Sequence, residues 1–199
     1  MKNSNKLLIL MVLTFFSYTL ISNPKITSVI YLTSTLIVII YSILKKEINM
    51  LHISSFISLI YAVEYTSIGY YEEFLTSFIS DSFVVSIFYY LYQIAFSLIG
   101  IVLFIFRVQV SRVISKSKHI KLTPFDNLLP WIYMYNFIAV TIHSFDYYLD
   151  EIHQVKTLSF FYIYYEEILY LGMSMIITIL VSMVIYHEKE KIQNNPIEN

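Results

Sequence analysis

Six long apolar stretches are the feature that most restricts how this chain folds. Each approaches the roughly 20 mostly apolar residues that a helix needs to cross a bilayer, and together they use about 120 of the 199 residues. The sequence therefore predicts an all-α, polytopic integral membrane protein with six transmembrane helices. Residues 1–199 form a single membrane domain in this interpretation, with a short polar C-terminal tail at 187–199. The six spans run from Leu7 to Ser22, Ile26 to Leu44, Leu51 to Tyr70, Phe83 to Phe106, Leu129 to Tyr148 and Ser159 to Tyr186.

Composition excludes several other classes of protein. Hydrophobic residues make up 57% of the chain and charged residues only 14%, against about 25% charged in an ordinary soluble domain. So few charges could not cover the surface of a water-soluble globule. The formal net charge of −1 does not favour a nucleic-acid partner. The absence of cysteine excludes disulfides, thiolate metal sites and cysteine nucleophiles.

The distribution of lysine and arginine predicts the orientation in the membrane. If the N-terminus is inside, 11 of the 13 cations fall in cytoplasmic segments, and only Lys25 and Lys156 lie outside. This asymmetry predicts a protein with both termini inside, in the inner (cytoplasmic) membrane of a bacterium. Nine of the 14 acidic residues fall on the outer side or in the outer halves of helices.

Ionisable side chains within the spans mark the candidate site, because each costs about 2.5–3.5 kcal/mol in the bilayer centre. At a rise of about 1.5 Å per residue, those in the third, fifth and sixth spans lie at similar depths, about 8–12 Å below the outer ends of their helices. A phenol on the fourth span falls at the same level. We therefore predict an outward-facing, acidic, tyrosine-rich pocket between the third, fourth, fifth and sixth spans that binds a proton, a cation or a small ligand. Its candidate residues are Glu64, Tyr90, His143, Asp146, Glu166 and Glu167.

Two simpler interpretations stand beside the pocket. Polar side chains in membranes commonly hydrogen-bond across helices and fix packing. Many of the 19 tyrosines also fall at outer helix ends, where an interfacial aromatic belt is expected in any such protein.

The sequence favours a binding or sensing module over an enzyme. It contains no His-Glu-x-x-His, Gly-x-Ser-x-Gly or phosphate-binding loop, and it indicates no cofactor. A metal-dependent intramembrane enzyme stays open as an alternative, because carboxylate and histidine ligands can come from separate helices. Whether a metal binds is left undetermined.

A small secondary transporter, or a transporter substrate-binding subunit, is the first alternative. Six helices in about 200 residues resemble the substrate-binding subunits of energy-coupling-factor transporters, although the Ala-x-x-x-Ala pattern of their first helix is absent. The three glycines form no Gly-x-x-x-Gly pattern for close helix approach.

Two segments suggest partners on the cytoplasmic side. The loop from Arg107 to Lys121 is basic with interspersed apolar residues, which is typical of a segment that contacts anionic lipid. The cations predicted to make this contact are Arg107, Arg112, Lys116, Lys118 and Lys121. The charged tail after Tyr186 resembles the exit of the multi-helix sensor modules that precede bacterial signalling domains, so a protein partner is expected at the tail.

Overall fold

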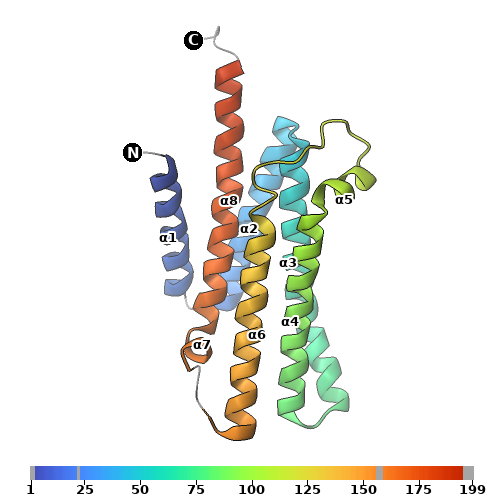
Figure 1. Ribbon diagram of the computed structural model, residues 1–199, viewed down its shortest axis with the longest axis vertical. Coiled ribbons are helices and arrows are strands. Elements are labelled where there is room, and N and C mark those ends of the chain that lie inside the picture. Colours follow the sequence, from blue (N-terminus) through green and yellow to red (C-terminus); the bar gives the residue numbers. More distant parts are fainter. Residues whose placement is uncertain (1–2, 22, 156–158, 195–199) are drawn as a thin grey trace.

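The computed structural model describes residues 3–21, 23–155 and 159–194, and these residues form helices joined by short connections, with no strand among them. The helices run alternately up and down in an elongated bundle (Figure 1). They are α1 (Asn3–Ile21), α2 (Pro24–Lys45), α3 (Ile48–Phe78), α4 (Ser82–Ile105), α5 (Arg107–Ile114), α6 (Leu129–His153), α7 (Ser159–Ile163) and α8 (Tyr165–Asn194).

Local sequence signals begin and end several of these helices. The side chain of Asn23 caps α2 by accepting hydrogen bonds from the backbone of Lys25 and Ile26, at 3.1 and 3.3 Å. Asp81 caps α4 in the same way, through the backbone N–H of Phe83 at 2.9 Å. At their C-termini, α2 and α6 are followed by the capping residues Lys46 and Gln154, whose φ angles of 57° and 53° are left-handed.

Two helices differ from the predicted spans. The third span was expected to end at Tyr70, but α3 continues to Phe78, because residues 71–78 are polar enough to end an apolar run yet contain no Gly or Pro to end a helix. The sixth span was expected as one helix from Ser159, but it is divided at Tyr164 into α7 and α8. The predicted polar tail is helical as far as Asn194, and its last residues, 195–199, lie outside the described residues.

Five helices form a closed ring. Neighbouring pairs in contact are α2 with α3, α3 with α4, α4 with α6, α6 with α8, and α8 with α2. Helix α1 lies outside this ring and packs mainly on α8. We call the end of the bundle that carries α5 the α5 end and the opposite end the α7 end (Figure 1).

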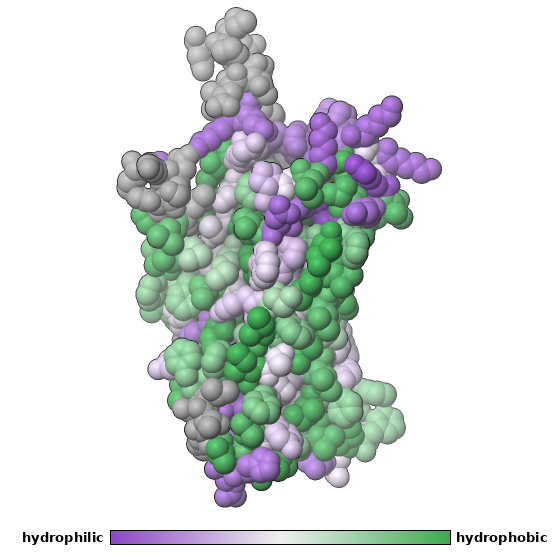
Figure 2. Space-filling view, viewed as in Figure 1, coloured by the Kyte–Doolittle hydropathy of each residue, from purple (hydrophilic) through white to green (hydrophobic). Residues whose placement is uncertain are grey.

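The apolar core fills the half of the ring nearest the α5 end. Its fully buried members include Ile53 and Ile57 on α3, Phe104 on α4, Leu129 on α6 and Leu180 on α8. The outer surface is also apolar: a broad hydrophobic band separates two polar ends in the space-filling view (Figure 2). Such a surface is expected where a protein faces lipid and not water.

Within the described residues, three helices are long and apolar enough to cross a membrane: α2, α4 and the part of α8 from Tyr165 to Glu190. The apolar part of α1, Leu8–Ile21, is shorter. Helices α3 and α6 have 31 and 25 residues but do not reach the same hydropathy. The structure thus defines an all-helical protein whose apolar helices are those of a membrane-embedded chain.

Candidate functional site

A cavity of about 500 Å³ lies inside the ring, in the half nearest the α7 end. All five helices of the ring contribute side chains to it, including α2, whose sequence was not part of the predicted pocket. We call it the ring cavity. Tyrosines dominate its lining, with Phe96, two carboxylates, one imidazole and two side-chain amides among the other members. The lining residues are Pro24, Ser28, Tyr31, Ile60, Tyr61, Glu64, Tyr65, Ile68, Tyr89, Tyr90, Gln93, Phe96, Ser97, Tyr133, Asn136, Val140, His143, Tyr165, Glu166, Leu169, Tyr170, Met173 and Ile176.

His143 on α6 is the centre of an aromatic cluster at this cavity. Its side chain is buried, and its ring stacks on Tyr165 of α8 with centroids 3.9 Å apart and planes inclined by 14°. Its Nε2 lies 3.2 Å from the hydroxyl of Tyr90 on α4, at hydrogen-bonding distance. The cluster therefore joins three helices through one imidazole.

Hydrogen bonds between side chains of different helices brace the cavity wall. The hydroxyl of Tyr165 donates to Gln93 Oε1 on α4 at 2.5 Å. On the opposite side, the hydroxyl of Tyr61 on α3 donates to Ser28 Oγ on α2 at 2.8 Å. Interhelical polar contacts of this kind hold neighbouring helices in register in an apolar solvent.

The two carboxylates occupy different positions. Glu64 on α3 is half-buried, whereas Glu166 at the start of α8 is exposed. The hydroxyl of Tyr170 donates to Glu166 Oε2 at 3.3 Å. Within the described part of the chain, Glu64 has no ion-pair partner among the basic side chains.

Of the six predicted site residues, Glu64, Tyr90, His143 and Glu166 line the ring cavity, and Asp146 and Glu167 do not. Asp146 is buried on α6, one turn from His143, and is not without an interaction partner. On α8, the hydroxyls of Ser174, Thr178 and Ser182 donate to backbone carbonyls one turn earlier on the same helix, and Glu166 lines the cavity from the start of this helix.

Two glycines allow the helices around the cavity to approach closely. The ring of Tyr133 on α6 lies against the backbone of Gly100 on α4, where a Cβ atom would overlap it. Asn136 Oδ1 lies in the same way against Gly172 on α8. Both glycines therefore let α6 pack closely against its neighbours, although they form no Gly-x-x-x-Gly pattern.

The arrangement does not preassemble a metal centre. Among residues 3–21, 23–155 and 159–194, no three His, Asp or Glu side chains gather closely enough to hold a metal ion. The predicted alternative of a metal-dependent enzyme therefore has no ready-made ligand set here.

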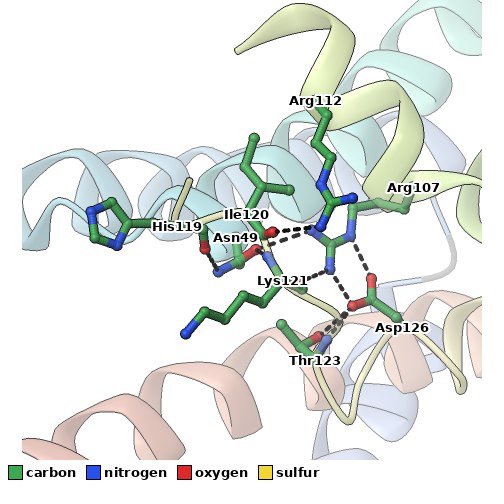
Figure 3. Close-up of polar contacts among 8 residues, drawn as sticks. All are labelled: Asn49, Arg107, Arg112, His119, Ile120, Lys121, Thr123 and Asp126. Carbon is green, nitrogen blue, oxygen red and sulfur yellow. Dashed lines mark hydrogen bonds and ion pairs between the residues drawn. The ribbon is translucent and has the colours of Figure 1, made fainter. Parts of the chain in front are cut away.

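A polar network at the α5 end was not predicted from the sequence (Figure 3). Arg107, at the start of α5, is buried and forms a bidentate ion pair with Asp126, whose Oδ1 accepts from Nε at 2.6 Å. The guanidinium also donates to Lys121 O at 2.7 Å and to Asn49 Oδ1 at 3.2 Å. Thr123 donates to Asp126 Oδ2 from its backbone N–H and its hydroxyl, at 2.6 and 2.9 Å. The network thus joins the start of α3, the start of α5 and the loop before α6.

This network changes the prediction for the basic loop. Arg107 is 1% exposed, so its guanidinium is not available to a lipid surface as predicted. The other four cations, Arg112, Lys116, Lys118 and Lys121, are exposed. One sequence signal could have identified the pair: Asp126 is the only acidic residue between Arg107 and Phe145.

A second cavity, of about 550 Å³, lies at the α5 end. It is lined by Lys46, Glu47, Asn49, Lys121, Phe125, Met183 and His187, among others. Completely buried side chains of the apolar core, including Ile53, Ile57 and Leu180, lie between it and the ring cavity.

Fold and site together define a class: an all-helical, membrane-compatible bundle with a polar, aromatic cavity inside a ring of five helices. In comparisons with known proteins, no family model, no curated protein and no solved structure matches the chain.

Proposed function

We propose that this chain is a membrane-embedded binding or sensing module that holds a small ligand, a cation or a proton in the ring cavity. One observation carries the proposal: five helices separated in sequence each direct side chains into one cavity that contains ionisable groups. Polar groups within a membrane bundle are costly and mark functional sites. The volume of about 500 Å³ lies within the range of small-molecule sites, about 300–1,000 Å³.

A ligand-stability screen with a matched pair of variants tests this proposal. Ser97 lines the cavity, whereas the adjacent Leu98 is 45% exposed on the outer surface of α4. Small molecules that raise the unfolding temperature of the purified protein should lose this effect in Ser97→Phe, which fills the cavity, and keep it in Leu98→Phe. A broad library without a single molecule that shows this pattern would refute the proposed function.

The proposed topology is six spans with both termini in the cytoplasm of a bacterial cell, in its inner membrane. The ring supports counting α3 and α6 as spans, since each lies between two helices of the ring and, with 31 and 25 residues, each is longer than α2 and α4, which have 22 and 24. The natural chain lacks cysteine, so single cysteines report topology without background. Ser80→Cys, between α3 and α4, should react with an impermeant thiol reagent in intact cells, and Ser117→Cys, after α5, only in disrupted membranes. If Ser117→Cys reacts in intact cells and Ser80→Cys reacts only in disrupted membranes, the orientation is the opposite of the proposed one.

Lipid and protein partners are proposed at the α5 end. The four exposed cations lie in the same segment as Val113, Ile114 and Leu122, which are 84%, 64% and 68% exposed. This mixture of basic and apolar side chains suits an anionic bilayer surface. The polar end of α8 is the proposed contact for a protein partner. Replacing the four cations with glutamine should reduce the anionic lipid that co-purifies with the protein, as measured by mass spectrometry.

Transport is the second candidate function, and the pair of cavities is the observation that favours it. A cavity at each end of the bundle, with a layer of apolar side chains between them, would give a ligand access from both sides if that layer opened. Concentrative uptake of a ligand into proteoliposomes would establish transport. If the ligand binds but is not transported, the chain acts as a binding module and not as a transporter.

A further inference from the structure

The charge of the ring cavity restricts its ligand. Among the described residues that line it are two carboxylates, Glu64 and Glu166, and neither lysine nor arginine. An anionic ligand would meet these carboxylates in a low-dielectric site with no fixed cation to offset them. The lining therefore selects against anions.

Glu64 is the group that most needs a partner. A carboxylate taken from water without a counter-charge is costly, and burial becomes tolerable when a cation or strong donors are supplied. No basic side chain of the described residues supplies that charge to Glu64. A ligand that carries a positive charge would do so.

The other lining residues indicate which kind of cation the cavity would bind, a metal ion or an organic ammonium group. A compact metal ion needs several ligands at short range, and the described residues do not gather three His, Asp or Glu side chains to supply them. The cavity instead presents aromatic rings, eight of them tyrosines: Tyr31, Tyr61, Tyr65, Tyr89, Tyr90, Tyr133, Tyr165 and Tyr170. The electron-rich faces of such rings attract organic ammonium groups, which are larger and more weakly hydrated than metal ions.

Apolar side chains line the cavity along the bundle axis. Glu166 lies toward the α7 end, and Ile176 lies ten residues further along α8, about 15 Å deeper. Ile60, Phe96 and Met173 join Ile176 at the deeper end, beside the polar Ser97 and Asn136, and Ile68 and Leu169 lie nearer the α7 end. A molecule with a cationic head near the carboxylates and an apolar body would therefore find both a counter-charge and apolar contacts in the cavity.

From this juxtaposition we infer that the ligand of the ring cavity is an organic cation, an ammonium group carried on an apolar body. Glu64 supplies the counter-charge, and the tyrosine rings surround the ammonium group. This inference rests on the proposed function and specifies its ligand class.

Three probes that share a benzyl group test the inference by calorimetry on the full chain in lipid nanodiscs: benzyltrimethylammonium, benzyl alcohol and phenylmethanesulfonate. The cation should bind most tightly. Glu64→Gln, which keeps the side-chain shape, should weaken its binding about tenfold or more, because the charge is lost in a low-dielectric site. Glu72→Gln, on the exposed end of α3, is the matched control and should leave binding unchanged.

A second pair of variants tests the aromatic contribution. Tyr65 is 37% exposed and stacks on Tyr61 with centroids 6.1 Å apart. Tyr65→Phe keeps the ring and should bind the cation as the natural chain does, whereas Tyr65→Leu should bind it about threefold more weakly.

The outcomes separate the inference from the proposed function. Equal binding of the cation and benzyl alcohol, with no effect of Glu64→Gln, would refute the inference that the ligand is an organic cation. The proposal that the cavity binds a ligand would stand. Preferred binding of the sulfonate, or no binding of the cation, would also refute the inference of an organic cation. The proposed function fails separately, if no library molecule depends on Ser97.

Discussion

The ion pair between Arg107 and Asp126 gives the sharpest prediction about stability. Both side chains are almost completely buried, at 0% and 2% exposure. Asp126→Asn keeps the shape of the side chain but leaves the guanidinium charged and unpaired. Breaking a buried pair in this way costs about 3–5 kcal/mol. For a chain of this length, about 2–4 °C is lost per kcal/mol, so the unfolding temperature should fall by about 6–20 °C.

The structure also predicts how a double variant behaves. Replacing both partners with apolar residues, Arg107→Met with Asp126→Leu, removes the unpaired charge and should recover part of the loss. Recovery should be incomplete, because Lys121 O, Asn49 Oδ1 and the Thr123 N–H lose partners worth about 1 kcal/mol each.

The assay is thermal unfolding of the purified protein in detergent, followed by loss of the monodisperse peak in size-exclusion chromatography. Glu188→Gln is the matched control, because the Lys45–Glu188 pair at the same end is 38% and 43% exposed and should contribute at most about 1 kcal/mol. If Asp126→Asn destabilises the protein no more than Glu188→Gln, the reasoning about burial is refuted.

Further predictions concern packing and depth. Gly100→Ala should destabilise the bundle by about 1–3 kcal/mol, because its Cβ would overlap the ring of Tyr133, whereas Gly69→Ala, with nothing within 4 Å, should be neutral or stabilising by up to about 1 kcal/mol. Equal unfolding temperatures for the two variants would contradict the close approach of α4 and α6. Trp131, the single tryptophan, is 70% exposed near the start of α6 and should lie at the lipid interface. Its fluorescence should be quenched more by lipids brominated near the headgroup than by lipids brominated near the chain end, and stronger deep quenching would place this end of α6 inside the bilayer core.

The sequence predicted much of the fold because hydropathy and capping are local properties. Four of the predicted spans agree closely with α1, α2, α4 and α6. The end of α3 was missed because an apolar run ends where polarity begins, while a helix continues until its backbone is interrupted. Three helices reach the apolarity and length of a membrane span, so six passes and their orientation stay predictions.

The depth of the site residues along their helices could be predicted from the sequence, but the direction in which each side chain points was less predictable. Counting residues along each helix placed Glu64, Tyr90, His143 and Glu166 at one level, and the structure places all four around one cavity. The same counting could not choose between Glu166 and Glu167, because adjacent residues on a helix point about 100° apart and the rotation of α8 is set by its neighbours. The part played by α2 was missed for a related reason: Ser28 and Tyr31 carry no charge to draw attention to them.

The closure of the ring by α2 and α8 has a consequence for biosynthesis. These two helices are far apart in the chain, and four of the five walls of the cavity are synthesised before α8. Until α8 inserts, the polar side chains of α3, α4 and α6 have no enclosing partner on that side and face lipid or the insertion machinery. The ring cavity is therefore completed only when α8, the last of its five helices, is added. A nascent chain stalled before that step would expose to membrane quality control the same groups that the finished protein encloses.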